Sequence, residues 1–248
     1  MLPIAGIQKL SLVDYPDHLC AILFLQGCNM RCPFCHNATL VPCEYESDSV
    51  YARRWEEVFD YLSHRRNFLE GVCITGGEPT LHKELPNLIH ELRSLGYKVK
   101  LDTNGTNSSM VEILLREGQI DYIAMDIKTS LSRYSELGVE NPLLIQQIRK
   151  TIKVIMDLAP HYEFRTTVVP GLVEEEDLRE ILQEIEGAQR YVFQSYRPDY
   201  VLDPNKAPSS MVAPDRVHKY VQIASQEVGE VLVRGYGDLM LSKTGSNC

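Results

Sequence analysis

The chain has 248 residues, of which 44% are hydrophobic, and a formal net charge of −9 at neutral pH. This length and this apolar share suit one α/β domain built around a single core. The negative charge and the lack of a Lys/Arg block argue against nucleic acid or an anionic membrane as a partner, since both need clustered basic side chains.

No apolar stretch is long enough to span a bilayer, and the N-terminus lacks a signal pattern, so we expect a cytoplasmic protein with no membrane segment. The seven cysteines are an odd number, which argues against a disulfide framework. Cys20 and Cys73 lie next to or within apolar runs and are expected in the core. Cys248 is expected in a frayed tail.

Hydrophobic periodicity predicts strands and helices that alternate along the chain. The predicted strands cover residues 4–12, 20–26, 71–75, 97–101, 120–127, 163–169, 191–194 and, as a last short one, 230–233. The predicted helices cover residues 52–66, 83–95, 109–117, 142–158, 174–186 and 214–226.

Six strands, from 20–26 to 191–194, are near-continuous apolar runs that are each followed by a helix, which predicts a parallel sheet with helices outside. Right-handed crossovers roll such a sheet towards a barrel, and six units fall short of the eight that close one. We therefore expect a partial (β/α)6 barrel in one domain of residues 1–248. A flat doubly wound sheet is the alternative. Residues 1–19 are expected as an N-terminal extension, and the helix and strand at about 213–236 as elements packed on the barrel.

Polar residues follow or close five of these six strands, and on the strand at 163–169 they include Arg165; the carboxyl ends of parallel strands meet at one mouth. The candidate residues there are Cys28, Cys32, Cys35, Gly76, Gly77, Glu78, Asp102, Thr103, Asp126, Lys128, Arg165 and Gln194. We therefore expect a single site at this mouth.

Three cysteines with the spacing Cys-x-x-x-Cys-x-x-Cys follow the strand at 20–26 directly. Three thiolates on a tight loop suit an iron–sulfur cluster or zinc. They are one short of the usual four for a four-iron cluster, which leaves one iron open to a chelating ligand. A closed site would need a fourth ligand from Cys43 or His36, and the loop character of residues 42–46 argues against Cys43.

The cysteine motif, with Phe34 before its third cysteine and Gly-Gly-Glu-Pro at residues 76–79, resembles the radical S-adenosylmethionine (SAM) superfamily. The stretches at 27–37, 101–105, 125–128 and 169–171 are similar to the glycyl-radical-enzyme activases, in particular those of anaerobic ribonucleoside-triphosphate reductase. The resemblance extends from about Gly6 to Gly235.

This resemblance implies a 4Fe-4S cluster on Cys28, Cys32 and Cys35, with SAM chelating the fourth iron. The other implied contacts are Phe34 and His36 near the adenine; the backbone of Gly76, Gly77 and Glu78 at the methionyl amino group; Asp126 and Lys128 at the methionyl carboxylate; and Asp102, Thr103 and Asp126 around a monovalent cation. Arg165 is either a second partner of that carboxylate or an interior residue paired with an acid. Gln194 stands where the family often has a histidine.

The implied activity is reductive cleavage of SAM to a 5′-deoxyadenosyl radical, which takes a hydrogen atom from a glycine of a partner enzyme. The implied partners are an anaerobic ribonucleotide reductase and a flavodoxin- or ferredoxin-type reductant. Because the cofactor carries the difficult chemistry, no side chain is expected to act as a general acid or base. One alternative is a radical SAM enzyme that acts on a small molecule, similar to 7-carboxy-7-deazaguanine synthase. Another is an electron-transfer iron–sulfur protein or a zinc-binding module.

Overall fold

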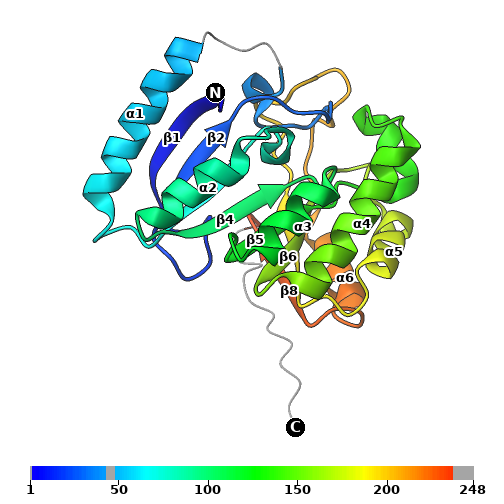
Figure 1. Cartoon of the computed structure of the whole chain (residues 1–248). Coiled ribbons are helices and arrows are strands. Elements are labelled where there is room, and N and C mark those ends of the chain that lie inside the picture. Colours follow the sequence, from blue (N-terminus) through cyan, green and yellow to red (C-terminus); the bar gives the residue numbers. More distant parts are fainter. Residues whose placement is uncertain (1, 43–47, 237–248) are drawn as a thin grey trace.

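The computed structural model describes residues 2–42 and 48–236, which form one sheet with helices packed against it (Figure 1). The strands are β1 (Ile4–Ser11), β2 (Cys20–Leu25), β3 (Gly71–Gly76), β4 (Lys98–Thr103), β5 (Tyr122–Asp126), β6 (Tyr162–Val168), β7 (Arg190–Ser195) and β8 (Glu230–Arg234). The α-helices are α1 (Asp48–Arg65), α2 (Leu85–Ser94), α3 (Ser108–Arg116), α4 (Pro142–Leu158), α5 (Glu175–Glu184) and α6 (Pro214–Ala224). Short 3-10 helices are η1 (Ala38–Leu40), η2 (Pro79–Leu81) and η3 (Leu131–Leu137).

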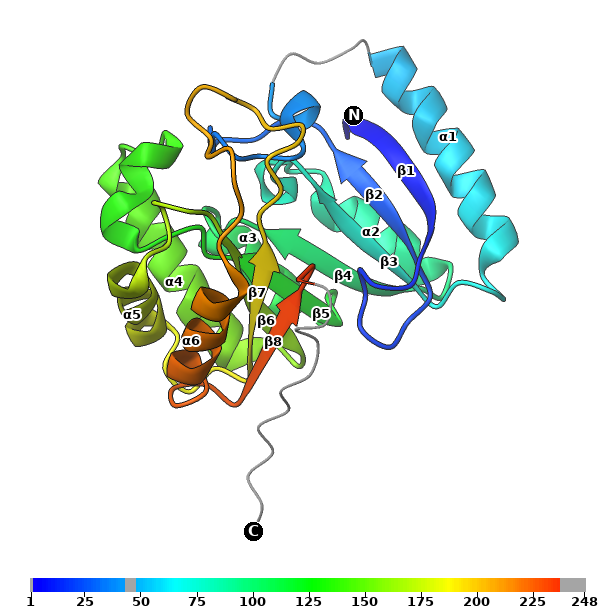
Figure 2. The same ribbon diagram turned by 180° about the vertical axis from the view of Figure 1, so that it is seen from behind.

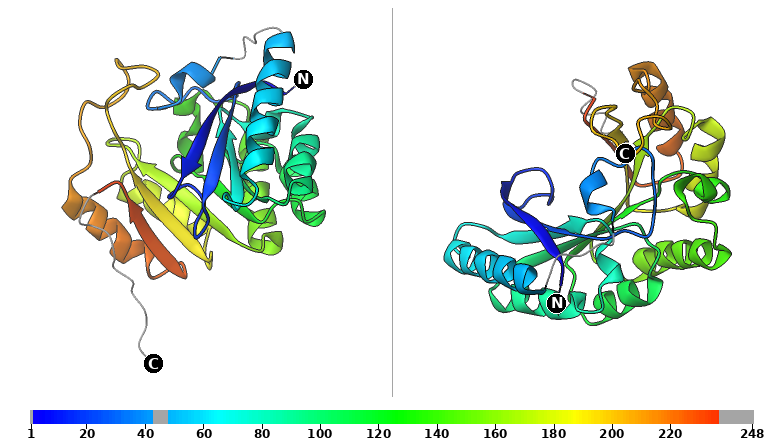
Figure 3. Two further views of the ribbon diagram at one scale, coloured as in Figure 1. Left: turned by 90° about the vertical axis from the view of Figure 1, so that its left-hand side faces the viewer. Right: turned by 90° about the horizontal axis from the view of Figure 1, so that it is seen from above.

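The eight strands of this sheet pair in chain order, from β1 to β8. β1 runs antiparallel to β2, and every later pair is parallel. β1 and β8 are the two edges, so within the described residues the sheet curves without closing (Figures 2 and 3). The predicted α/β partial barrel is confirmed.

The end of the chain differs from the expectation in one respect. We expected the strand at 230–233 to pack on the barrel, whereas β8 extends the sheet as a further parallel strand beside β7, with Arg190 opposite Glu230. A parallel strand of only five residues gives a weak sequence signal. None of the described helices is both long and apolar enough to cross a membrane.

Apolar side chains form two separate clusters, one on each face of the sheet. The larger joins the sheet to the helices that cover its outer face (Figure 3). The smaller cluster contains Tyr15, Cys20, Ile22, Cys73, Tyr122 and Ala124. Cys20 is 0% exposed and Cys73 is 1% exposed, so their predicted burial is confirmed.

Local sequence sets the helix starts. α4 begins at Pro142, as predicted, because proline suits the first turn and the side chain of Asn141 accepts a hydrogen bond from the Leu143 N–H. In the same way, the side chain of Asn107 caps α3 by accepting from the Met110 N–H.

The inner face also holds a buried ion pair between β6 and β8. Glu163 is 0% exposed, and its carboxylate accepts hydrogen bonds from Nη1 and Nη2 of Arg234 at 2.7 and 2.8 Å. The Tyr122 hydroxyl donates to the same carboxylate at 2.9 Å. Burial raises the pKa of Glu163, but Arg234 outweighs burial, and the net direction is below the ordinary value. This pair therefore links strands that are not neighbours in the sheet.

Arg234→Ala leaves the buried Glu163 carboxylate without its cation, so we expect the free energy of unfolding at pH 7 to fall by about 3 kcal/mol. Arg149 on α4 makes a similar contact with Glu184 on α5, but the Arg149 side chain is 48% exposed. Arg149→Ala should therefore cost under about 1 kcal/mol. Chemical denaturation of both variants measures the difference, and equal losses would contradict this account.

The pair of Glu163 and Arg234 makes the free energy of unfolding depend on pH. Because the folded protein lowers the pKa of Glu163, the stabilisation is fully present above the ordinary glutamate pKa and is lost as the pH falls through the folded value. The unfolding free energies of wild type and Arg234→Ala should therefore converge as the pH falls.

Candidate functional site

A cavity of about 450 Å³ opens where the parallel strands end. The predicted site residues that line it are Cys28, Cys32, Phe34, Cys35, His36, Gly76, Gly77, Glu78, Asp102, Thr103, Asp126, Lys128, Arg165 and Gln194. The structure therefore brings every predicted site residue to one place. The volume falls within the range of about 300–1,000 Å³ that is typical of small-molecule sites.

The three cysteines lie on the loop between β2 and η1. Backbone hydrogen bonds fix the start of this loop, from the Gly27 N–H to the Leu40 oxygen at 2.7 Å and from the Cys28 N–H to the Val41 oxygen at 3.2 Å. Within the loop, the Cys35 N–H donates to the Cys32 oxygen at 3.0 Å. Backbone hydrogen bonds thus shape the loop that carries the three thiols.

Burial raises the pKa of the Cys28 thiol to about 11 and that of the Cys32 thiol to about 12. The ammonium group of Lys128 opposes both shifts. The thiolate is the form that binds metal, so loading a cluster releases protons here and places thiolate charge near Lys128.

The fourth-ligand candidates are placed differently. Cys43 lies outside the described residues. A ring nitrogen of His36 lies 2.7 Å from the Arg197 oxygen, and the ring stacks on Tyr196 with 6.2 Å between centroids. His36 is thus tied to the loop after β7. Among residues 2–42 and 48–236, no three His, Cys, Asp or Glu residues form a group that could hold a single metal ion.

The glycines after β3 are needed for a close approach between two loops. A Cβ on Gly77 would lie 2.1 Å from the Gly27 oxygen, and a Cβ on Gly76 would lie 2.3 Å from the Leu25 oxygen. We expected glycine here so that the backbone could approach a ligand. The structure adds a second reason, because the backbone must first fit against the start of the cysteine loop.

Glu78 directs its side chain into the protein. Its carboxylate is 1% exposed and accepts hydrogen bonds from the Thr103 hydroxyl at 2.8 Å and from the Asn104 N–H at 2.6 Å. Burial raises the pKa of Glu78, and these hydrogen bonds oppose the shift. The carboxylate therefore joins the loops after β3 and β4, and the backbone of Glu78 is the part that suits the predicted ligand contact.

A line of five charged side chains crosses the inner face of the sheet. Lys100 pairs with Asp102. Arg165 donates from Nη1 to Asp102 at 3.2 Å and from Nε to Asp126 at 2.8 Å, and Lys128 donates to Asp126 at 2.9 Å. Asp126 and Lys128 thus point to the same side, as two residues so spaced on an extended strand should. Arg165 is thus an interior residue paired with two acids, and it also lines the cavity.

Asp102, Thr103 and Asp126 are the three residues predicted to surround a monovalent cation. They do lie together at the cavity, but each already has partners within the protein. The carboxylates of Asp102 and Asp126 hold the cationic side chains just described, and the Thr103 hydroxyl donates to Glu78. Burial raises the pKa of both carboxyls, but Arg165 and the lysines outweigh it, so each pKa lies below its ordinary value.

Two residues at this site had no predicted role, namely Asn104, which belongs to the stretch at 101–105, and Lys100. Asn104 donates from Nδ2 to Asn29 at 3.0 Å and lies 3.9 Å from the Cys28 sulfur. Lys100 is 1% exposed and pairs with Asp102 from below the cavity. The available signal for Lys100 was its place in β4, two residues before Asp102 and therefore on the same face, but Lys98 in the same strand has the same spacing pattern.

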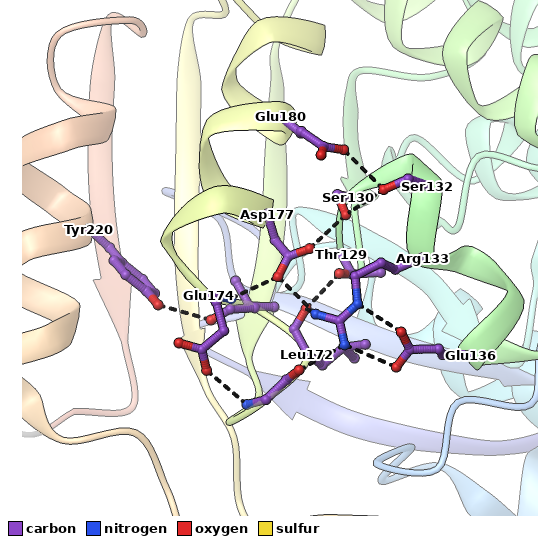
Figure 4. A network of polar contacts seen from close by, with 12 residues as sticks. Thr129, Ser130, Ser132, Arg133, Glu136, Leu172, Glu174, Asp177, Glu180 and Tyr220 are labelled. Atoms are coloured by element: carbon purple, nitrogen blue, oxygen red, sulfur yellow. Dashed lines mark hydrogen bonds and ion pairs between the residues drawn. The ribbon is translucent and has the colours of Figure 1, made fainter.

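The loops after β5 and β6 are held together by a polar network around Arg133 (Figure 4). Its guanidinium contacts Asp177 at 2.9 Å, Glu136 at 2.7 Å and the Gly171 oxygen at 2.8 Å. At the end of this segment, the Leu137 oxygen accepts from the Arg31 N–H at 2.8 Å. The network therefore connects the loop around Gly171 to the cysteine loop.

A profile of the Radical SAM superfamily matches residues 22–185, which span the cysteine loop and most of the sheet. The chain belongs to the radical SAM superfamily.

Similar proteins extend this assignment. A Methanocaldococcus jannaschii protein named as a glycyl-radical enzyme activating enzyme is 32% identical over 236 residues, covering 93% of this chain and 95% of its own. The pyruvate formate-lyase-activating enzyme of Staphylococcus aureus is 27% identical over 204 residues, covering 77% of this chain and 79% of its own. Streptococcus suis SuiB bound to S-adenosylmethionine has a similar fold, with a TM-score of 0.61 and 21% identity over 88% of this chain and 52% of that chain.

The cofactors of this radical SAM enzyme are a 4Fe-4S cluster and SAM, as in its superfamily. The residues present fit both groups. Cys28, Cys32 and Cys35 supply soft ligands at the rim of the cavity, and Lys128 and Arg165 supply positive charge beside them for a carboxylate.

Gly77→Ala should disturb the junction of the cysteine loop with the loop after β3, because the new Cβ meets backbone that cannot move aside cheaply. We expect a loss of about 1–3 kcal/mol in the unfolding free energy of the cluster-free protein. We also expect less iron and sulfide per chain after anaerobic reconstitution. The control is Gly6→Ala on β1, where a Cβ has nothing within 4 Å and should leave both quantities unchanged. Wild-type values for Gly77→Ala would contradict the proposed contact.

Proposed function

We propose that this radical SAM enzyme is a cytoplasmic activase, which takes a hydrogen atom from a glycine of a partner glycyl-radical enzyme. The partner that the sequence motifs favour is an anaerobic ribonucleoside-triphosphate reductase, and the electron comes from a flavodoxin- or ferredoxin-type reductant. The observation that carries the proposal is the end-to-end similarity to the Methanocaldococcus jannaschii protein.

The open sheet supports a protein substrate. β1 and β8 are unpaired with each other within the described part of the chain, so the cavity lies in a barrel that is open on one side. A protein loop carrying the target glycine needs such an opening. A small-molecule enzyme would instead need polar groups that close the site around its substrate.

In this proposal, the chain's own residues bind and orient. Cys28, Cys32 and Cys35 would hold the cluster through their thiolates. Lys128 and Arg165 attract the methionyl carboxylate of SAM, and the backbone from Gly76 to Glu78 accepts hydrogen bonds from the methionyl amino group. Phe34, His36 and Gln194 line the remaining wall of the cavity, where the adenosine fits.

When bound, the cluster and SAM supply a 5′-deoxyadenosyl radical after uptake of one electron. The protein contributes ligation, orientation and exclusion of water. Phe34 is 6% exposed and belongs to the apolar core, so it shields the middle of the cysteine loop. No side chain of the site is assigned an acid or base role.

The proposal is tested with anaerobically reconstituted, reduced protein and SAM. We expect 5′-deoxyadenosine and methionine, and an electron paramagnetic resonance signal of a glycyl radical only when the reductase is present. The matched control is a reductase whose radical-bearing glycine is replaced by alanine, which should show no such signal. 5′-Deoxyadenosine without a radical on any glycyl-radical enzyme would favour the small-molecule alternative. Absence of 5′-deoxyadenosine throughout would overturn the enzymatic assignment and favour the electron-transfer alternative.

Cys32→Ala should abolish cluster reconstitution, because only two thiolates then remain on the loop. Cys73→Ala is the internal control, since Cys73 is 1% exposed and lies in the inner apolar cluster rather than on the cysteine loop. Cys43→Ala should also retain the cluster. Iron and sulfide analysis with visible absorption measures all three variants. Equal loss in Cys32→Ala and Cys43→Ala would instead require a site with four cysteines.

A further inference from the structure

Lys100 on β4 is a buried cation outside the lining of the cavity. It is 1% exposed, its ammonium group pairs with Asp102, and it lies 3.6 Å from the Cys73 sulfur. The ring centroid of Tyr122 is 6.0 Å away. Lysine is almost never fully buried without a partner. The position of Lys100 is therefore defined by Asp102, which does line the cavity.

The charges in this part of the inner face do not cancel. Lys100, Arg165 and Lys128 supply three positive charges, whereas Asp102 and Asp126 supply two negative charges. In the cluster-free protein, with the cysteines as thiols, the network keeps one positive charge in excess. The side chains of Arg165 and Lys128 are only 10% and 19% exposed, so this charge is poorly screened by solvent.

The neighbouring charged groups leave this excess in place. The negative charge of Glu163 acts on Lys100 and Arg165, but its carboxylate is already bound by Nη1 and Nη2 of Arg234. Arg190 pairs with Glu230. A buried excess charge is unfavourable unless a counter-charge joins it. An anionic group bound in the cavity beside Arg165 and Lys128 would provide that counter-charge.

We propose that Lys100 is a built-in counter-ion for Asp102, which takes the electrostatic place of a monovalent cation, so that Arg165 and Lys128, although paired with Asp102 and Asp126, keep the net positive charge that attracts the carboxylate of SAM. Without Lys100, the charges of Asp102 and Asp126 would balance those of Arg165 and Lys128, and the network would be neutral. Lys100 does not line the cavity, so it is a positioning residue. The role concerns the cofactor and is independent of which glycyl-radical enzyme is the partner.

The first test uses the wild-type, cluster-loaded protein. The affinity for SAM is measured by isothermal titration in potassium chloride, in sodium chloride and in choline chloride at equal ionic strength. Choline is too large to enter a pocket beside a buried carboxylate. We expect the three dissociation constants to agree within about twofold. An affinity about tenfold weaker in choline chloride would show that a small cation is required, and would overturn the proposal.

The second test uses Lys100→Met, which keeps an unbranched side chain of similar length and removes its charge. We expect the affinity for SAM to fall about tenfold or more in choline chloride, as for a lost charge-assisted contact, and to recover in part in potassium chloride. The control is Lys150→Met, because Lys150 is 52% exposed and pairs with Glu112 on the surface. It should bind SAM as the wild type does in every salt.

Thermal unfolding of the cluster-free variants separates this role from a purely structural one. A structural lysine would lower the unfolding temperature of Lys100→Met without making the SAM affinity depend on the cation. Should Lys100→Met fail to fold, Lys100→Arg retains the charge and should keep the wild-type insensitivity to the cation. Wild-type affinity of folded Lys100→Met in choline chloride would overturn the proposal.

Discussion

The buried carboxylate of Glu78 holds the site together. The carboxylate accepts hydrogen bonds from Thr103 and Asn104, and the backbone N–H of Glu78 donates to the Gly27 oxygen at 2.7 Å. Asn104 in turn contacts Asn29 on the cysteine loop. Three loops that are far apart in the sequence thereby become one rigid unit. Because an unsatisfied buried carboxylate is costly, each loop is held in place by the need to satisfy it.

Below this junction, charged side chains occupy an inner face that an ordinary parallel sheet would fill with apolar residues. The acids of β4 and β5 meet Arg165 of β6, and Glu163 meets Arg234 of β8. Such pairs contribute little net stability compared with apolar packing, but breaking one is expensive. These side chains set a fixed electric field at the mouth of the barrel, where Lys128 opposes the increase that burial causes in the pKa values of Cys28 and Cys32.

The sequence predicted the architecture and the residues of the cavity because both follow from local rules. α4 begins at a capped proline, and parallel strands must end on the same side. The ion-pair partners of charged side chains could not be predicted in this way, because they depend on the register between strands. Lys98 and Lys100 both alternate with apolar residues along β4, and this pattern does not reveal that Lys98 is exposed while Lys100 is buried beside Asp102. The clash that an alanine at Gly77 would make is likewise a property of two loops together, which neither loop reveals alone.

β1 contributes Gln8 to the lining of the cavity, and it also determines what kind of strand precedes the cysteines. By pairing antiparallel with β2, it turns β2 into an interior strand with hydrogen bonds on both sides. Without it, the strand leading into Cys28 would present a free row of amides, which invites pairing with other chains and fraying. An oxygen-sensitive cluster must be loaded onto a loop that keeps its shape while empty. The pairing of β1 with β2 therefore helps the cysteine loop to keep its shape in the cluster-free protein.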